Sequence, residues 1–139
     1  MQKHFSLLED LYLCAPIQSL HPSTTISVED RKATIQMPVN EKHLHAAKGM
    51  HGSVYFRLLD DAAFFAANSI ELNYFVLTGS FNVKLLKPVT AGLLKSIGNI
   101  KEANDKKIIA SSELFNEKGE TIAKGEGIFI RSKVLLNSI

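Results

Sequence analysis

The stretch HGSVYFRLLDDAAFFAANS, from His51 to about Ser69, decides the fold of this chain. Apolar side chains cover most of its circumference, and no Pro or Gly interrupts it after Gly52, which favours a long helix over a strand. At ~100° per residue, one narrow stripe holds the positions that depart from the apolar pattern. These positions are Arg57, Asp60, Asp61, Phe64 and Asn68. Because so apolar a helix has to be buried, we expect the rest of the chain to wrap around it.

The flanking segments have the patterns of one further helix and six strands. Residues 4–13 carry apolar side chains at helical spacing, and Pro16 ends that helix. Apolar runs, most of them alternating, predict strands at 24–29, 33–37, 75–89, 93–101, 107–115 and 121–131. Gly79 marks a bulge in the third of these strands, and residues 40–50 lack a period and form a loop. Asn116–Gly119 has the form of a hairpin loop, with Gly119 where a positive φ is needed.

The predicted fold class is α+β. We expect an antiparallel sheet of about six strands wrapped around one long central helix, with an N-terminal helix before it. The last four strands are joined by short links, which predicts that they are antiparallel neighbours. No linker, repeat or low-complexity segment divides the chain, so residues 1–139 are expected to form a single domain.

Composition excludes several classes of function. The 16 basic and 14 acidic residues give a net charge of +2, which provides no electrostatic footprint for nucleic acid. No window approaches the ~20 apolar residues of a membrane span, and Glu9 and Asp10 interrupt any signal-peptide core at the N-terminus. We therefore expect a soluble, cytoplasmic protein with no nucleic-acid or membrane partner.

Cysteine usage limits the metal and redox chemistry. Cys14 is the single cysteine, so the chain forms no disulfide with itself, and no motif supplies the ligands of a zinc site. We expect no metal. Because Cys14 lies in the apolar stretch from Leu11 to Ala15, we expect a buried thiol that acts as a small hydrophobic side chain.

The residues that carry chemistry gather in three motifs. His51-Gly52-Ser53 opens the central helix, and Asp60 follows nine positions after His51. A strand segment at 78–89 ends in Pro-Val, and the segment at 119–125 forms the last hairpin. In this order, over roughly residues 24–131, the motifs resemble the PaaI-type acyl-CoA thioesterases of the hotdog superfamily.

The resemblance implies an activity and an assembly. It implies a hotdog fold and hydrolysis of acyl-CoA to free acid and CoA, with no cofactor. It also implies a homodimer, with a homotetramer as the larger alternative, whose active site lies at the subunit interface and takes its acidic residue from the partner's helix. The catalytic candidates are then Asp60, Gly52, His51 and His45.

Physical chemistry gives reasons for these roles. Thioester hydrolysis needs an activated water and a place for the oxyanion. The first N–H groups of a helix have no intrahelical acceptor, so the Gly52 N–H is free to donate to an oxygen that gains negative charge. The small Ser53 lets the acyl carbonyl approach closely. The Asp60 carboxylate orients or deprotonates the water, or attacks directly.

Each candidate also has a structural interpretation. Asp60 is otherwise a solvated residue at the polar edge of its helix, and His51 a hydrogen-bonded residue that starts the helix. Asp61 lies four positions after Arg57, which predicts a helical ion pair. The substrate-binding candidates are otherwise plain strand, helix or surface residues: Ser53, Thr78, Gly79, Ser80, Asp61, Lys84 and Lys87. The two lysines, with Arg131 and Lys133, are candidates for the CoA phosphates.

Two positions depart from the family pattern. Ser53 replaces the second Gly of the usual His-Gly-Gly, and His45 stands six residues before His51, where the family generally has an Asn that holds the water. An imidazole hydrogen-bonds a water as an amide does, but it also titrates near neutral pH. The alternative function is a non-catalytic module that binds acyl-thioesters, and a hydratase or dehydratase of the same fold is the third.

Overall fold

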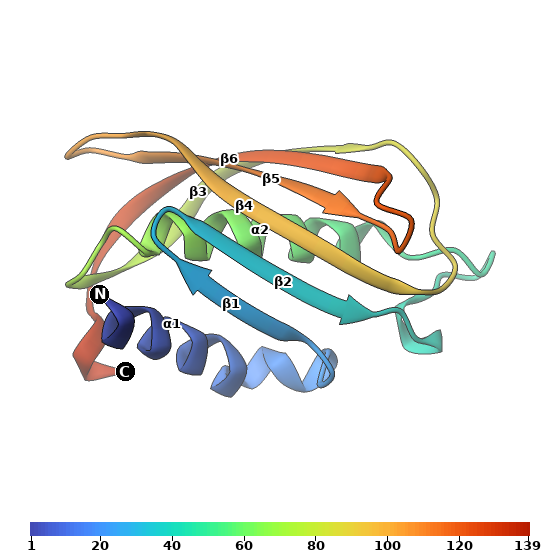
Figure 1. The fold of residues 1–139 in the computed structure, drawn as a ribbon, viewed down its shortest axis with the longest axis horizontal. Coiled ribbons are helices and arrows are strands. Elements are labelled where there is room, and N and C mark those ends of the chain that lie inside the picture. Colours follow the sequence, from blue (N-terminus) through green and yellow to red (C-terminus); the bar gives the residue numbers. More distant parts are fainter.

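The computed structural model describes all 139 residues and contains two α-helices and one six-stranded antiparallel sheet (Figure 1). The main elements are α1 (Gln2–Cys14), β1 (Thr25–Glu29), β2 (Lys32–Pro38), α2 (Gly52–Asn68), β3 (Tyr74–Leu85), β4 (Leu93–Ala103), β5 (Ile108–Phe115) and β6 (Thr121–Leu135). Short 3₁₀ helices are η1 (Pro16–Leu20), η2 (Glu41–His43) and η3 (Leu136–Ser138). The predicted fold class, both helices and all six strands are confirmed.

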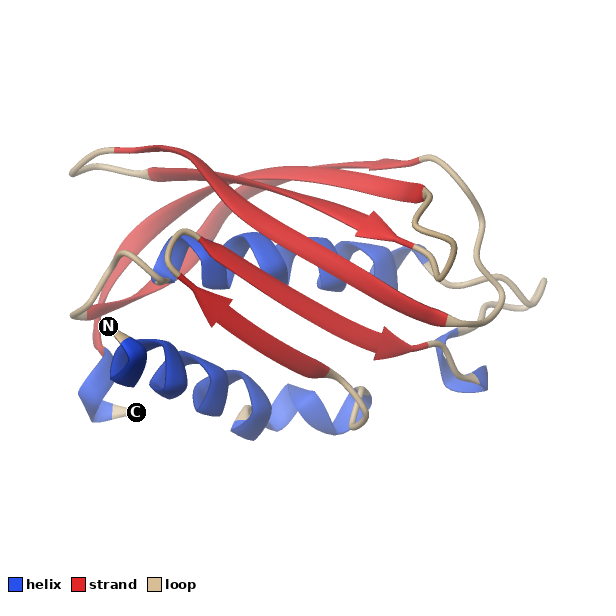
Figure 2. Ribbon diagram, in the orientation of Figure 1, coloured by secondary structure: helices blue, strands red, loops and turns tan.

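Helix α2 is the centre of the core, and the strands form a curved layer across it (Figure 2). Small residues on the inner face of the sheet let the helix approach by its backbone. A Cβ added at Gly98 would lie 2.1 Å from the Ala62 carbonyl oxygen. Ser96 Oγ donates to the Leu58 carbonyl oxygen at 2.8 Å, and Ser112 Oγ donates to the carbonyl oxygen of Leu59 at 2.7 Å. These contacts fix the helix at the turn that leads into residue 60.

The strand order is β1-β2-β4-β5-β6-β3. The expectation that β3 and β4 are neighbours is therefore wrong, because β3 pairs with β6 and β4 pairs with β2. The link at residues 86–92 can span ~20 Å when extended, which exceeds the ~14 Å across three strand spacings. Its length thus permits the crossover. The order leaves β3 at an edge of the sheet. The predicted bulge at Gly79 in this strand is confirmed by a register shift between Thr78 and Ser80.

Helix α1 packs beside β1 and closes one end of the core. Its buried side chains are Phe5, Leu8 and Tyr12. The Tyr12 ring packs edge-on against the Phe65 ring, with the ring centroids 5.3 Å apart. Cys14 lies off this stripe and is exposed, so the expectation of a buried thiol is wrong. No helix has both the length and the apolar character needed to cross a membrane.

Candidate functional site

Asp60 points from α2 toward β3, and a hydroxyl on that strand holds its carboxylate. Thr78 Oγ1 donates to Asp60 Oδ1 at 2.9 Å. Burial raises the pKa of Asp60, and the hydrogen bond from Thr78 lowers it in part. The carboxylate is neither freely solvated nor sealed from water. A raised pKa makes a carboxylate a better proton acceptor, so this position suits a general base.

The neighbouring carboxylate, Asp61, is engaged in an ion pair. Arg57 Nε lies 3.2 Å from Asp61 Oδ2, which confirms the predicted pairing four residues apart. The same guanidinium donates to Gln18 Oε1 and to the Ile17 carbonyl oxygen, so it also fastens η1 onto α2. Burial raises the pKa of Asp61 to about 6, against the lowering effect of Arg57. The two adjacent carboxylates therefore have different surroundings and different partners.

His51 forms the N-cap of α2. Its Nδ1 accepts a hydrogen bond from the Ser53 N–H at 3.0 Å and lies 2.8 Å from Ser53 Oγ, which fits the structural interpretation of this residue. Gly52 is the first residue of the helix, so its N–H has no intrahelical acceptor. A Cβ added at Gly52 would meet only Leu85 Cδ1, at 3.9 Å, so the space beside this Cα is open.

The candidate residues open onto two different clefts of the single chain. The larger, of about 730 Å³, lies between η1, η2 and α2 and is lined by His51, Ser53 and Asp60, among others. The smaller, of about 350 Å³, is lined by His45, Gly52 and residues 85–88, among others. Neither cleft contains both Asp60 and Gly52. The base candidate and the oxyanion candidate of one chain are therefore not brought together within that chain.

His45 belongs to the smaller cleft, where it lies over a tight turn. Its N–H donates to the Gly49 carbonyl oxygen at 2.8 Å, and its Nδ1 accepts from the Ala47 N–H at 3.1 Å. A neutral ring whose Nδ1 accepts a hydrogen bond carries its proton on Nε2. His45 can therefore donate to a water through Nε2, as the amide of an Asn would.

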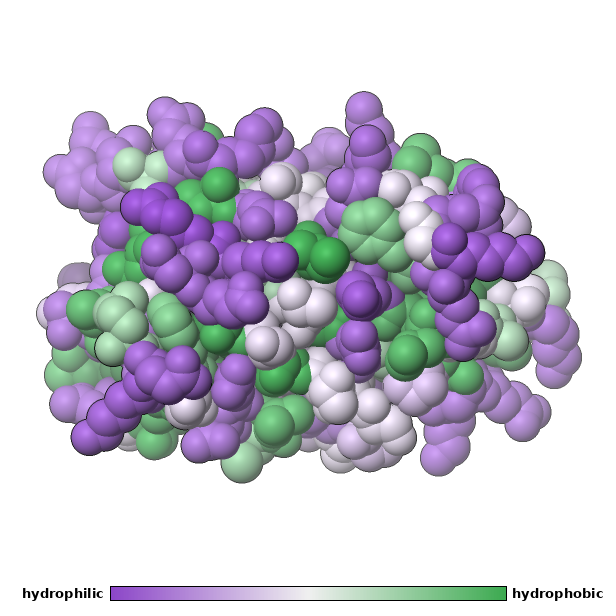
Figure 3. Space-filling model, viewed as in Figure 1, coloured by the Kyte–Doolittle hydropathy of each residue, from purple (hydrophilic) through white to green (hydrophobic).

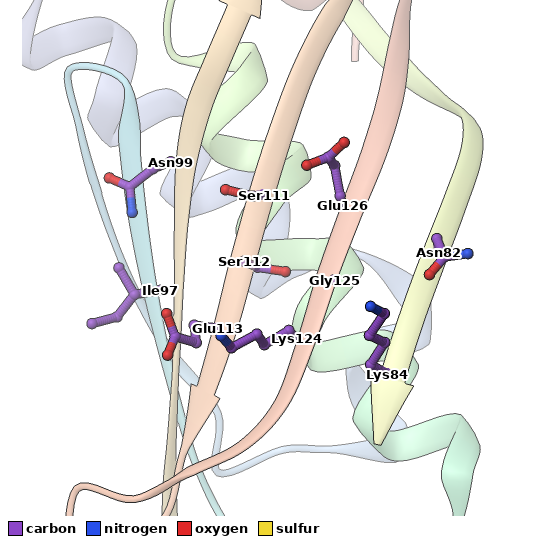
Figure 4. Close-up of a pocket in the computed structure, with 10 residues that line it drawn as sticks. All are labelled: Asn82, Lys84, Ile97, Asn99, Ser111, Ser112, Glu113, Lys124, Gly125 and Glu126. Atoms are coloured by element: carbon purple, nitrogen blue, oxygen red, sulfur yellow. The ribbon is translucent and has the colours of Figure 1, made fainter. Parts of the chain in front are cut away.

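The other candidates on and after β3 are scattered. Gly79 and Ser80 are exposed on the edge strand. Lys87 lines the smaller cleft and pairs with Glu120 at 2.8 Å. Lys84 instead lines a groove of about 300 Å³ on the outer face of the sheet, together with Lys124 (Figure 4). Hydrophilic and hydrophobic residues are interspersed on the molecular face seen in Figure 3. The structure does not bring Lys84 to the clefts that hold Asp60 and Gly52.

Sequence reasoning missed a pair of histidines in the larger cleft. His21 Nδ1 lies 2.9 Å from His43 Nε2, with ring centroids 4.8 Å apart. The two residues are far apart in the sequence, next to or within short irregular helices, so no periodic pattern joins them. The only available signal was the concentration of histidines between His43 and His51. The chain contains no group of three or more His, Cys, Asp or Glu side chains that could hold a metal ion.

A model of the thioesterase superfamily matches residues 48–123, which contain α2, β3, β4, β5 and the start of β6. The chain belongs to the thioesterase superfamily. The matched segment includes Gly52, Asp60 and Thr78. No curated protein matches the chain by sequence.

Solved structures at 17–20% identity share the fold. The PaaI protein of Escherichia coli, from the phenylacetic acid degradation operon, has a TM-score of 0.87 at 20% identity, with 96% of each chain covered. A thioesterase family protein from Silicibacter pomeroyi has a TM-score of 0.81 at 20% identity, covering 90% of this chain and 95% of that one. A hypothetical thioesterase from Streptococcus pneumoniae, solved with coenzyme A, has a TM-score of 0.76 at 17% identity, covering 82% and 89%. The predicted hotdog fold is confirmed.

Proposed function

We propose that this chain hydrolyses acyl-CoA thioesters to the free acid and CoA, at a site that two copies of the chain build together. Membership of the thioesterase superfamily supports thioester hydrolysis. The structural neighbour from Streptococcus pneumoniae that was solved with coenzyme A supports CoA as the carrier. The raised pKa of Asp60 and its hydrogen bond to Thr78 support this carboxylate as the base.

One observation carries the shared site. Gly52 and Asp60 lie on the same helix, eight residues apart, which is ~12 Å along the axis at ~1.5 Å per residue. The oxyanion donor and the water-activating base both have to lie within hydrogen-bonding reach of one reacting thioester. Since one straight helix separates them too widely, the base has to come from a second copy. Two α2 helices that run antiparallel about a two-fold axis would meet this requirement.

The uncovered edge of the sheet supports the same assembly. Strand β3 has a hydrogen-bonded neighbour on one side only, and it carries exposed Leu77. On α2, Phe56 is 42% exposed and lies one turn before Asp60. Long open edges of sheets are normally paired or covered. Pairing β3 with its counterpart in a second copy would extend the sheet across a homodimer.

The proposed reaction uses one water and no cofactor. Asp60 accepts a proton from the water as the oxygen attacks the thioester carbonyl carbon. The carbonyl oxygen becomes an oxyanion, which the Gly52 N–H and the α2 dipole of the other copy stabilise. The C–S bond then breaks, the acid is released, and the CoA sulfur takes up the proton held by Asp60.

The test is release of free thiol from a panel of acyl-CoAs. Because exposed Cys14 would itself react with a thiol reagent, the assay uses Cys14→Ser as its background. In that background, Asp60→Asn should lower kcat by ~10²–10⁴, the usual contribution of a positioned base. Asp61→Asn is the matched control, and it should cost much less because Asp61 is paired with Arg57. Binding of acyl-CoA without thiol release would instead identify a non-catalytic module.

A further inference from the structure

The His21–His43 contact in the larger cleft has a defined proton arrangement. His43 Nδ1 accepts a hydrogen bond from the Asn40 N–H at 3.0 Å. Because that ring nitrogen has to be unprotonated, neutral His43 carries its proton on Nε2. His43 Nε2 therefore donates to His21 Nδ1, 2.9 Å away. Both rings are neutral in this arrangement, and neither nitrogen of the shared hydrogen bond can take another proton without breaking it.

His43 also holds the start of α2. Its side chain is buried, with a residue exposure of 3%, and its carbonyl oxygen accepts from the His51 N–H at 2.9 Å. His51 in turn caps α2 through the Ser53 N–H at 3.0 Å. Hydrogen bonds and the backbones of His43 and His51 thus link His21, which follows η1, to the helix terminus that presents the Gly52 N–H.

We propose that the His21–His43 pair positions the N-terminus of α2, and that acidification releases this terminus by protonating the pair. Both residues are positioning residues, since they act on Gly52 through the backbone of His43 and His51. The inference rests on the proposed function only in giving Gly52 a role in the reaction. The positioning itself is a property of the fold.

The surroundings of the pair favour the neutral rings. The titratable and charged side chains that line the clefts around it are Tyr12, Lys42, His51, Arg57, Asp60 and Asp61. Burial lowers the pKa of His21 to about 4, and the Arg57 charge and the His43 ring contribute to this lowering. Burial also lowers the pKa of His43. An opened pair would regain a histidine pKa near ~6.5, so the closed pair is stable above that pH and loses stability as the pH falls toward about 4.

The experiment follows amide hydrogen exchange at the His51 N–H from pH 7 to pH 4, corrected for the intrinsic exchange rate. In the wild-type protein, protection should fall between pH ~6.5 and ~4, by up to about tenfold per pH unit for each of the two rings that takes up a proton on opening. His21→Ala removes the acceptor and should lower protection already at pH 7. His21→Asn places a non-titrating amide oxygen where Nδ1 lies, so it should restore protection at pH 7 and leave a shallower acid response, the part that His43 alone supplies. His4→Ala is the matched control, because His4 Nε2 contacts the Asn68 carbonyl oxygen at the far end of α2.

Two outcomes would overturn the inference. One is wild-type protection at His51 that stays constant between pH 6.5 and pH 4. The other is protection in His21→Ala equal to that of His4→Ala at pH 7. Amide exchange needs no turnover, so absence of thioesterase activity would refute the proposed function and leave this result intact. Hydrolysis of acyl-CoA by a protein with unchanged exchange would refute this inference alone.

Discussion

Replacement of Gly52 by proline tests whether the first N–H of α2 stabilises the oxyanion. Gly52 occupies the first helical position after the His51 N-cap, where proline is well tolerated because its missing N–H has no intrahelical acceptor. The residue before a proline has to be extended, and His51 already has φ −64° and ψ 142°. Gly52→Pro therefore removes one donor while leaving the helix in place.

The expected loss is large and specific. Removal of one oxyanion donor costs ~10²–10³ in kcat, or about 3–4 kcal/mol. Gly52→Ala keeps the N–H, and its Cβ would meet only Leu85 Cδ1 at 3.9 Å, so it is the matched control. The assay is thiol release under saturating acyl-CoA, with thermal unfolding of each variant measured in parallel. Equal turnover of the proline and alanine variants would refute the oxyanion role of this N–H.

Mixing Gly52→Pro with Asp60→Asn extends the test to the shared site. If one copy supplies Asp60 and the other supplies Gly52, each mixed dimer contains one site with both residues intact. Random mixing makes half of the dimers mixed, each with one of two sites intact, so about a quarter of wild-type activity should return. If Gly52 and Asp60 served the same thioester from one chain, mixing would restore nothing. Recovery therefore separates a site between copies from a site within one copy.

Three further changes have distinct expected outcomes. Asp61 holds its proton more tightly in the folded state, with a pKa of about 6, so stability should fall as the pH rises through about 6; urea unfolding of Asp61→Asn should lack this step. Gly98→Ala would place a Cβ 2.1 Å from the Ala62 carbonyl oxygen, and this overlap should lower the free energy of unfolding by at least ~1–3 kcal/mol. Its Tm should be several degrees below that of Asn99→Ala, the control change at an exposed position of the same strand. His45→Asn should retain turnover, because an amide N–H can donate to the same water as Nε2 of the ring; a large loss of turnover in this variant would contradict that role.

The sequence was sufficient for the helices and strands because its strongest signals are local. The apolar circumference of residues 51–69 predicts a buried helix without any tertiary information, and the alternating runs predict the strands. Strand order depends on the path of the link at 86–92, which periodicity does not encode, so the expected pairing of β3 with β4 is wrong. The expectation of a buried Cys14 is wrong for a related reason. Its neighbours along the chain are apolar, but the buried stripe of α1 passes through Tyr12 and not through residue 14.

The candidate site likewise has parts that the sequence predicts and parts that only the tertiary structure shows. The spacing of Gly52 and Asp60, and the helical pairing of Arg57 with Asp61, follow from positions on one helix. The hydrogen bond from Thr78 to Asp60 joins residues 18 positions apart, and only the packing of β3 against α2 brings them together. The His21–His43 pair depends on the meeting of two irregular segments, for which the sequence contains no periodic signal.

The residues that pack α2 against the sheet differ from those that form the proposed site. Ser96, Gly98 and Ser112 hold the helix through carbonyl groups at residues 58–62, on the side that faces the sheet. Asp60 and Phe56 leave the same turns toward the edge strand β3, where Asp60 meets Thr78, Phe56 packs on Phe81, and Phe56 is exposed. Changes at Ser96, Gly98 and Ser112 should therefore lower stability first. They should lower activity only indirectly, by displacing Asp60. Changes at the exposed Phe56 should leave the fold intact and act on the proposed dimer, and hence on turnover at the proposed shared site.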